Sequence, residues 1–280
     1  MPLLGEGALK NREDQKILGT DKEKSLYAPQ DYFWTKLGQN CAVHGVCVDH
    51  YFFPCGYVDV ASTGVLSVLS GGELYFYNAF DVNKQGAKFA NDLQRTLART
   101  FGFDALLRIR VSNGLKIEDY FGNFYMKNAT DIECAGIDSL KAFTAVLKHD
   151  GKLDERRETY IQSALLYTTS QGQRRVRVHN LPLQNSSQYD SIFRNSSTEV
   201  TISVFIRQMI QQSADVSLAS LRSSLSGSIA RALASFRQKA AKQPAKGQLV
   251  LPEAMKLGPI LALCVLKNRA FRAGNFTLIS

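Results

Sequence analysis

The stretch from Thr159 to Leu183 constrains the fold of this 280-residue chain more than any other. An apolar run over residues 161–167 leads into Ser-Gln-Gly-Gln at 170–173, and basic and apolar residues then alternate over 175–179. Two β-prone runs around a short connection that contains glycine predict a β-hairpin. The two-residue period of a strand places Val176 and Val178 on one face and Arg175, Arg177 and His179 on the other. We expect the valines to pack in a core, and the basic face to be either a solvated surface or a surface for anionic partners.

Residues 1–102 alternate between helical and β-rich segments. A helix is expected to start near Asp31, and a short helix over 59–69 to end at the glycine pair 71–72. The runs 46–53 and 73–80 are β-rich, and residues 84–101 carry apolar side chains at 89, 93, 97 and 101. This order predicts an α/β domain with a partly parallel sheet.

Short strands dominate residues 103–198. Strands are predicted over 105–111, 116–125 and 142–148, in addition to the hairpin. Asn113-Gly114 is a typical hairpin turn, so we expect the strands on either side of it to pair. Several short strands at such spacing predict a β-sandwich.

Residues 199–280 are predicted to be helical. Apolar residues recur at helical spacing over 200–214 and 218–242, and a last helix is expected over 255–267. Gly258-Pro259 should kink or restart that helix.

The net charge of +9 lies almost wholly in the last 80 residues, where 11 basic residues face two acidic ones. Such an excess favours an anionic neighbour, which is a membrane surface, nucleic acid or an acidic protein. Arginines near aromatic residues on the predicted strands would also suit an RNA-binding sheet. Because residues 101–200 are nearly neutral and hold no ribonucleoprotein motif, an RNA-binding module is only an alternative and no nucleic acid is expected.

Motifs of enzymes and metal sites are not found in the sequence. It has no Walker loop, GxGxxG, HExxH or GxSxG pattern, so we do not expect an enzyme. The five cysteines form no CxxC pair, which argues against zinc or a disulfide framework. No signal peptide and no apolar run of membrane-spanning length is recognised, so a cytosolic protein is expected.

Six segments together resemble the cargo-adaptor subunit of the COPII vesicle coat, the Sec twenty-four family. They occur in the family's order and cover nearly the whole chain. The sequence of residues 124–131 is similar to that of the animal subclass typified by the C and D paralogues. The segments are GEGALKNRED (5–14), YVDVASTGVLSVLSGGELYFY (57–77), residues 89–138, KHDGKL (148–153), IQSALLYTTSQGQRRVRVHNL (161–181) and GQLVLPEAMKLGPI (247–260).

The resemblance implies a mixed α/β multi-domain fold. Residues 1–102 are similar to the C-terminal part of a von Willebrand-like α/β trunk, 103–198 to a β-sandwich domain, and 199–280 to the N-terminal part of a helical domain. It implies no cofactor in this chain, because the family's zinc ribbon lies outside it. It also implies a fragment of a longer adaptor, with open sheet edges and exposed apolar surface.

One binding site follows from the resemblance. Arg108 and Arg110 match the family's R-x-R strand, whose arginines hold acidic export signals. Alternate residues share a strand face, so two guanidiniums can take a pair of carboxylates. Arg174, Arg175 and Arg177 form a possible basic surface without an assigned role.

The implied function is cargo selection for vesicle transport from endoplasmic reticulum to Golgi. The implied partners are the Sec twenty-three coat subunit, cytosolic tails of membrane cargo and SNAREs, and the acidic membrane surface. The implied location is the cytoplasm and the cytosolic face of the endoplasmic reticulum and of COPII vesicles. A truncated coat relic that captures no cargo is the other interpretation.

Overall fold

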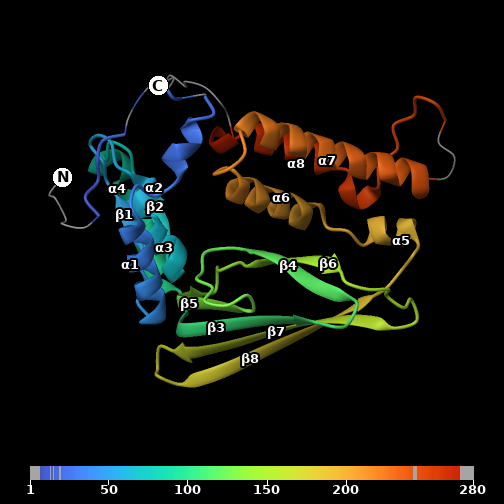
Figure 1. Cartoon of the computed structure of the whole chain (residues 1–280), viewed down its shortest axis with the longest axis horizontal. Helices are drawn as coiled ribbons and strands as arrows, with labels where there is room; N and C mark the ends of the chain where they lie inside the picture. The colour runs from blue at the N-terminus through green and yellow to red at the C-terminus, as the bar shows by residue number, and fades with distance from the viewer. Residues whose placement is uncertain (1–6, 13, 15, 19, 242–244, 272–280) are drawn as a thin grey trace. The chain divides into compact units, whose positions relative to one another are not determined.

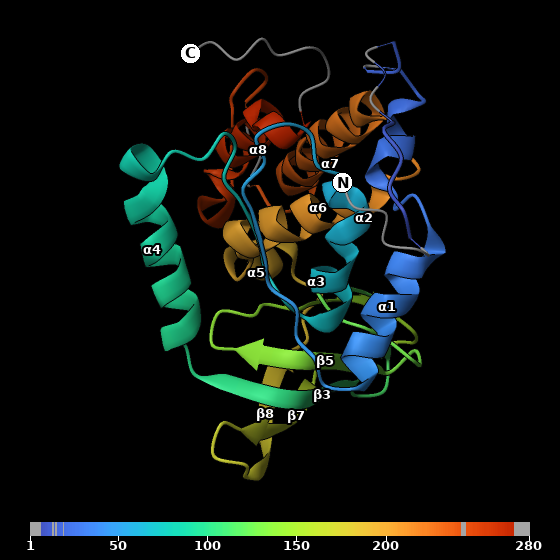
Figure 2. The same ribbon diagram turned by 90° about the vertical axis from the view of Figure 1, so that its left-hand side faces the viewer.

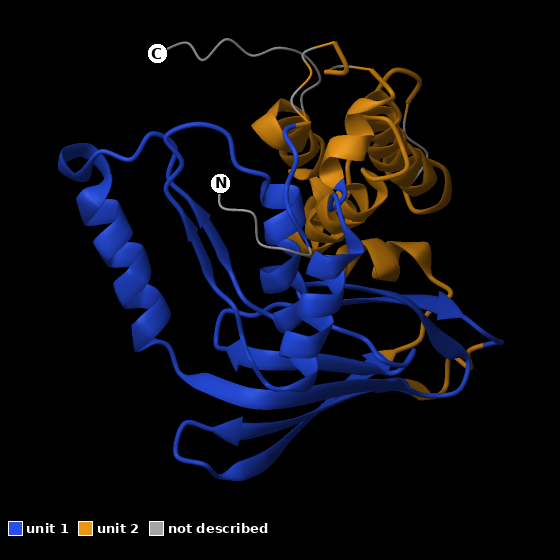
Figure 3. Cartoon of the chain, turned by 60° about the vertical axis from the view of Figure 1, so that its left-hand side comes forward, with its two compact units in different colours: residues 1–11, 28–152, 159–183 blue, residues 12–27, 153–158, 184–280 orange. Residues whose placement is uncertain are grey.

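The structure is a computed structural model of the chain, and it describes all residues except 1–6, 13, 15, 19, 242–244 and 272–280 (Figure 1). The chain forms two compact units (Figure 3). The first contains residues 1–11, 28–152 and 159–183, and the second contains residues 12–27, 153–158 and 184–280. The domain boundaries expected after residues 102 and 198 stay predictions.

The helices at the start of the first unit begin and end at the residues that their sequence favours. Helix α1 (Tyr32–Val43) starts where the Asp31 carboxylate accepts a hydrogen bond from the Phe33 amide. Helices α2 (Val60–Thr63) and α3 (Val65–Ser70) follow, and α3 ends at Gly71 with a φ of +79°. Helix α1 packs beside α3, and both contact strand β5 (Asp131–Asp138), as Figure 2 shows.

Strands β1 (His50–Phe52) and β2 (Leu74–Phe76) form a parallel pair that is shorter than the predicted runs. Helix α4 (Val82–Ala98) follows them. The expected apolar stripe is wrong at its end, because Leu97 is 73% exposed and Phe101 already belongs to a strand. The buried residue of α4 is Thr96, whose hydroxyl lies 3.0 Å from that of Tyr51. A polar residue is favoured on this helix face because it packs against tyrosine hydroxyls of the strands.

A four-stranded sheet and a two-stranded ribbon form the predicted β-sandwich. The sheet has the order β5-β3-β7-β8, and the ribbon pairs β4 with β6. Figure 1 shows the ribbon over one face of the larger sheet. Buried Ala105, Ile132 and Cys134 form the core with partly buried residues such as Leu107, Tyr120 and Leu165. The strand bounds are β3 Phe101–Val111, β4 Leu115–Phe121, β6 Thr144–His149, β7 Glu158–Thr169 and β8 Arg174–Gln184.

The Asn-Gly turn is present, but the strands beside it do not pair as predicted. Gly114 has a φ of +95°, and the Leu115 amide donates to the Ser112 carbonyl. Strand β3 pairs antiparallel with β5 on one side and β7 on the other, whereas β4 pairs with β6. Because both edges of β3 are occupied, the turn leads from one sheet to the other.

The hairpin of β7 and β8 is confirmed, but the expected burial of Val176 and Val178 is wrong. The Thr169 amide donates to the Gln173 carbonyl at 2.9 Å, and Gly172 has a φ of +79°. Val176 is 65% exposed and Val178 is 49% exposed. Their strand is the last of the sheet, and they lie on its outer face, which the β4–β6 ribbon does not cover.

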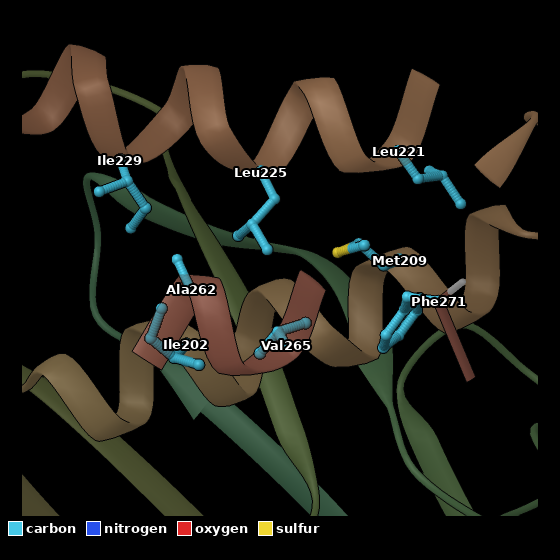
Figure 4. Close-up of a cluster of buried hydrophobic side chains, with 8 residues drawn as sticks. All are labelled: Ile202, Met209, Leu221, Leu225, Ile229, Ala262, Val265 and Phe271. Carbon is cyan, nitrogen blue, oxygen red and sulfur yellow. The ribbon is translucent and has the colours of Figure 1, made fainter. Parts of the chain in front are cut away.

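The second unit is helical, as predicted. Helices α6 (Thr198–Gln212), α7 (Leu218–Lys239) and α8 (Gly258–Lys267) surround one apolar core. Figure 4 shows Leu221, Leu225 and Ile229 of α7 pointing toward residues of α6 and α8. Helix α8 begins at Gly258 with Pro259 in its first turn, which confirms the predicted restart. The shorter elements are η1 Glu23–Tyr27, α5 Tyr189–Arg194, η2 Glu253–Met255 and η3 Arg269–Phe271.

Candidate functional site

Strand β3 positions Arg108 and Arg110 on the outer face of the sandwich. Ala105 and Leu107 of the same strand pack in the core. The two-residue period of a strand therefore turns both arginines away from the core. In the register of the sheet Arg108 lies between Asp131 of β5 and Ala164 of β7, and Arg110 lies beside Gln162 of β7.

A carboxylate of the chain itself holds Arg108. Its Nε and Nη2 donate to Oδ1 and Oδ2 of Asp131 at 2.5 and 2.6 Å, which is a bidentate pair. The Asn128 amide also donates to Asp131 at 3.0 Å. These hydrogen bonds lower the pKa of Asp131 to about 2, and the bond from Arg108 has the largest effect. The Arg108 side chain is 41% exposed, and the donors that Asp131 does not use remain for a ligand.

Arg110 has no such partner. Its Nη1 donates to Oε1 of Gln162 at 3.3 Å, and Gln162 in turn donates to Asn180 of β8 at 2.9 Å. Arg110 is exposed and forms no ion pair with another residue in the described part of the chain. The site thus combines one arginine whose charge is balanced and whose position is fixed with one that carries a net positive charge.

The three arginines of β8 do not form one surface. Arg174 donates from Nη1 to the Asp104 carboxylate at 2.8 Å and to the Thr168 hydroxyl at 2.8 Å. Arg175 donates to Oε1 of Gln173. By the strand period Arg174 shares the outer face with Arg108 and Arg110, whereas Arg175 and Arg177 point to the other side of the sheet.

Sequence reasoning missed a buried ion-pair network around Arg99. Its Nη1 lies 2.7 Å from Glu73 and 3.1 Å from Asp138, whose side chain is 2% exposed. The hydrogen bond from Arg99 is the main cause that lowers the pKa of Glu73, and the bond to Glu73 raises the pKa of Arg99. These residues lie far apart in sequence, so no local pattern indicates the network. It joins the residue before β2, the end of α4 and the end of β5 within the first unit.

In the part of the chain that the structure describes, no group of three or more His, Cys, Asp or Glu side chains is placed to hold a metal ion. None of its helices has the length and apolar character needed to cross a bilayer.

Comparisons with known proteins agree with this architecture. Residues 1–97 match the Sec23/Sec24 trunk domain, residues 102–186 the Sec23/Sec24 beta-sandwich domain, and residues 197–278 the Sec23/Sec24 helical domain. A crystal structure of the human COPII-coat protein Sec24c matches with a TM-score of 0.90 and 40% identity, over 96% of this chain and 36% of that one.

Curated relatives carry the same family name. The chain is 41% identical over 268 residues to human "Protein transport protein Sec24C", which is 96% of this chain and 24% of the relative. It is 42% identical to human "Protein transport protein Sec24D", over 94% of this chain and 25% of the relative. Identity to human "Protein transport protein Sec24A" is 30%, which confirms the predicted similarity to the C and D subclass. The chain spans about a quarter of the length of these relatives. The chain therefore belongs to the Sec23/Sec24 family, whose trunk, β-sandwich and helical domains it matches in this order.

Proposed function

We propose that this chain is a non-enzymatic part of a COPII coat adaptor that selects cargo for transport from the endoplasmic reticulum to the Golgi. The observation that carries the proposal is the pair of arginines on the outer face of β3, in a chain whose relatives are named as protein transport and COPII-coat proteins. Arg108 and Arg110 are the residues that bind an acidic export signal in the cytosolic tail of a membrane protein or SNARE.

The two arginines have different tasks in this binding. Asp131 fixes the plane of the Arg108 guanidinium, so that its remaining N–H groups are oriented before a ligand arrives. Arg110 supplies the net positive charge that attracts a carboxylate. Their Cα atoms are two strand rises apart, roughly 7 Å, which suits two carboxylates of one extended peptide.

The proposed partners and location are supported by the family to which the chain belongs. We propose that the chain acts together with the Sec twenty-three coat subunit on the cytosolic face of the endoplasmic reticulum. The basic residues of 201–280 then add long-range attraction to acidic lipid head groups. We propose no cofactor for this chain, because the resemblance places the family's zinc ribbon outside the matched domains.

A binding assay with charge-reversed variants tests the proposal. We expect a fluorescent peptide with two carboxylates, designed to resemble an acidic tail signal, to bind the wild-type chain and to lose at least about tenfold in affinity with Arg108→Glu/Arg110→Glu. The matched control is Lys36→Glu/Lys152→Glu, which changes the net charge equally at two exposed lysines outside β3. Equal affinity of the arginine variant and the control would refute the assignment of the site.

A further inference from the structure

The turn that leads into β5 lies directly beside the proposed binding site of Arg108. Asp131 is the first residue of β5, and it forms the last pair of the register with β3, where it lies opposite Arg108. Thr130 comes immediately before it, and residues 127–130 are all exposed. The turn therefore places an exposed threonine next to the carboxylate that orients Arg108.

Three hydrogen bonds hold this turn, and one oxygen accepts all of them. Oδ1 of Asn128 accepts from the amide and the hydroxyl of Thr130, each at 2.9 Å, and from the Asp131 amide at 2.8 Å. Nδ2 of Asn128 donates to the Asp131 carboxylate at 3.0 Å. Modification of the hydroxyl would remove one of the three bonds, and the two bonds from the backbone would keep the turn closed.

The Thr130 hydroxyl lies close to the Asp131 carboxylate. The bond from Arg108 is the largest cause that lowers the pKa of Asp131 to about 2, and the bond from Asn128 is the second. The Thr130 hydroxyl adds to this lowering. An anion attached to this oxygen would therefore be repelled by Asp131 and attracted by Arg108. Asp131 uses two of the five N–H groups of that guanidinium, which leaves three for other acceptors.

The residues after Thr130 suit a protein kinase. Asp131 and Glu133 follow it at the first and third positions, where acid-directed kinases select acidic residues. Such a kinase transfers the γ-phosphoryl group of ATP to the threonine oxygen and releases ADP and the hydroxyl proton. The phosphate then carries up to two negative charges at neutral pH.

We propose that Thr130 is a phosphorylation site whose phosphate blocks the binding of acidic signals on β3. The phosphate takes the donors of Arg108 that Asp131 leaves, and its charge opposes a carboxylate that approaches Arg110. The chain then binds an acidic signal only while Thr130 is unmodified. This inference rests on the function proposed above, because it describes how that site is regulated.

A comparison of the phosphorylated and unphosphorylated chains tests the inference. Phosphothreonine is incorporated at position 130 during protein synthesis, and the fluorescent peptide with two carboxylates is the probe. We expect the phosphorylated chain to bind it at least about tenfold more weakly than the wild type does. Equal affinity of the two chains would refute this inference alone. If neither chain binds the peptide, the proposed function fails and this inference fails with it.

Treatment with an acid-directed kinase and ATP tests whether such an enzyme modifies the turn. We expect mass spectrometry to find phosphate on Thr130, and Glu133→Gln to slow its incorporation. The treatment should weaken peptide binding by the wild type but not by Thr130→Val, which has a similar shape and no hydroxyl. A Thr130 that stays unmodified in the folded chain would overturn the assignment of the site.

Phosphorus NMR separates pairing with Arg108 from a loss of folding. The reference is a phosphorylated peptide of residues 124–133, which contains the same lysine and carboxylates as the turn but no arginine. The second pKa of a phosphothreonine is about 6, and we expect it to be lower in the folded chain than in the peptide, because Arg108 stabilises the dianion. A value equal to that of the peptide, or higher, would mean that Arg108 does not hold the phosphate and would overturn the proposal.

Discussion

Asp131 determines how the two arginines of β3 differ. Sequence spacing predicts that Arg108 and Arg110 share a strand face, but the partner of Arg108 depends on the register of β3 against β5. Asp131 is 23 residues from Arg108, so no local pattern indicates the pair. The consequence is a site with one oriented guanidinium and one without an ion pair among the described residues.

The lowered pKa of Asp131 predicts a pH-dependent contribution to stability. Its value of about 2 in the folded chain is below the roughly 3.9 of an unfolded aspartate, so the stabilisation is fully present above about pH 4 and is lost as the pH falls toward 2. We expect Asp131→Asn to be less stable than the wild type at pH 7, with a difference that shrinks as the pH falls. Urea denaturation at pH 7, 5, 4 and 3 measures it. A difference that stays constant over this range would contradict the account.

Among the residues that form ion pairs in the first unit, Arg99 is the one whose replacement should destabilise the unit most. Arg99→Met leaves the buried Asp138 carboxylate without its cation, and we expect a loss of about 3 kcal/mol in the free energy of unfolding. Arg157→Met is the matched control, because Arg157 is 85% exposed where it meets Asp154 at 3.8 Å. Chemical denaturation compares the two variants. Equal, small losses would show that the network contributes little.

At the scale of elements, local signals predict helix ends and the hairpin but not which strands become neighbours. Asp31, Gly71 and Pro259 mark helix boundaries because caps and turns act within a few residues. Pairing of β3 with β5 and β7 depends on contacts between residues far apart in the sequence, so the Asn-Gly turn suggests the wrong partner. The alternation in β8 identifies two faces correctly, but it does not predict burial, because all 11 residues of this last strand of the sheet are exposed.

The exposure of Val176 and Val178 gives a prediction that separates the observed fold from the expected one. Because both side chains are largely in solvent, Val176→Thr/Val178→Thr should change the free energy of unfolding by less than about 1 kcal/mol. Leu225→Ala in α7 is the contrasting control, since Leu225 is 2% exposed and its truncation should cost about 3 kcal/mol. A loss in the β8 variant as large as that in the control would mean that the valines are buried.

At the scale of the whole molecule, the charge distribution predicts which part of the chain contacts a membrane. We expect the chain to bind vesicles that contain anionic lipids, and to dissociate as salt rises from about 0.05 to 0.5 M. Arg231→Glu/Lys246→Glu, in the basic last 80 residues, should weaken binding more than Lys36→Glu/Lys152→Glu, which changes the net charge equally. Vesicle flotation measures both. Equal weakening would mean that net charge alone, and not its location, determines binding.

A charge-swap experiment tests the central claim, the binding of an acidic signal by β3, most directly. The affinity of an acidic tail peptide is measured for the wild type and for Arg110→Glu, and then again with a peptide in which one carboxylate residue is replaced by lysine. The account predicts that Arg110→Glu loses the acidic peptide and gains the lysine peptide, because a new pair of opposite charges replaces the old one. If no lysine position in the peptide restores binding to Arg110→Glu, Arg110 does not contact the signal and the assigned site is wrong.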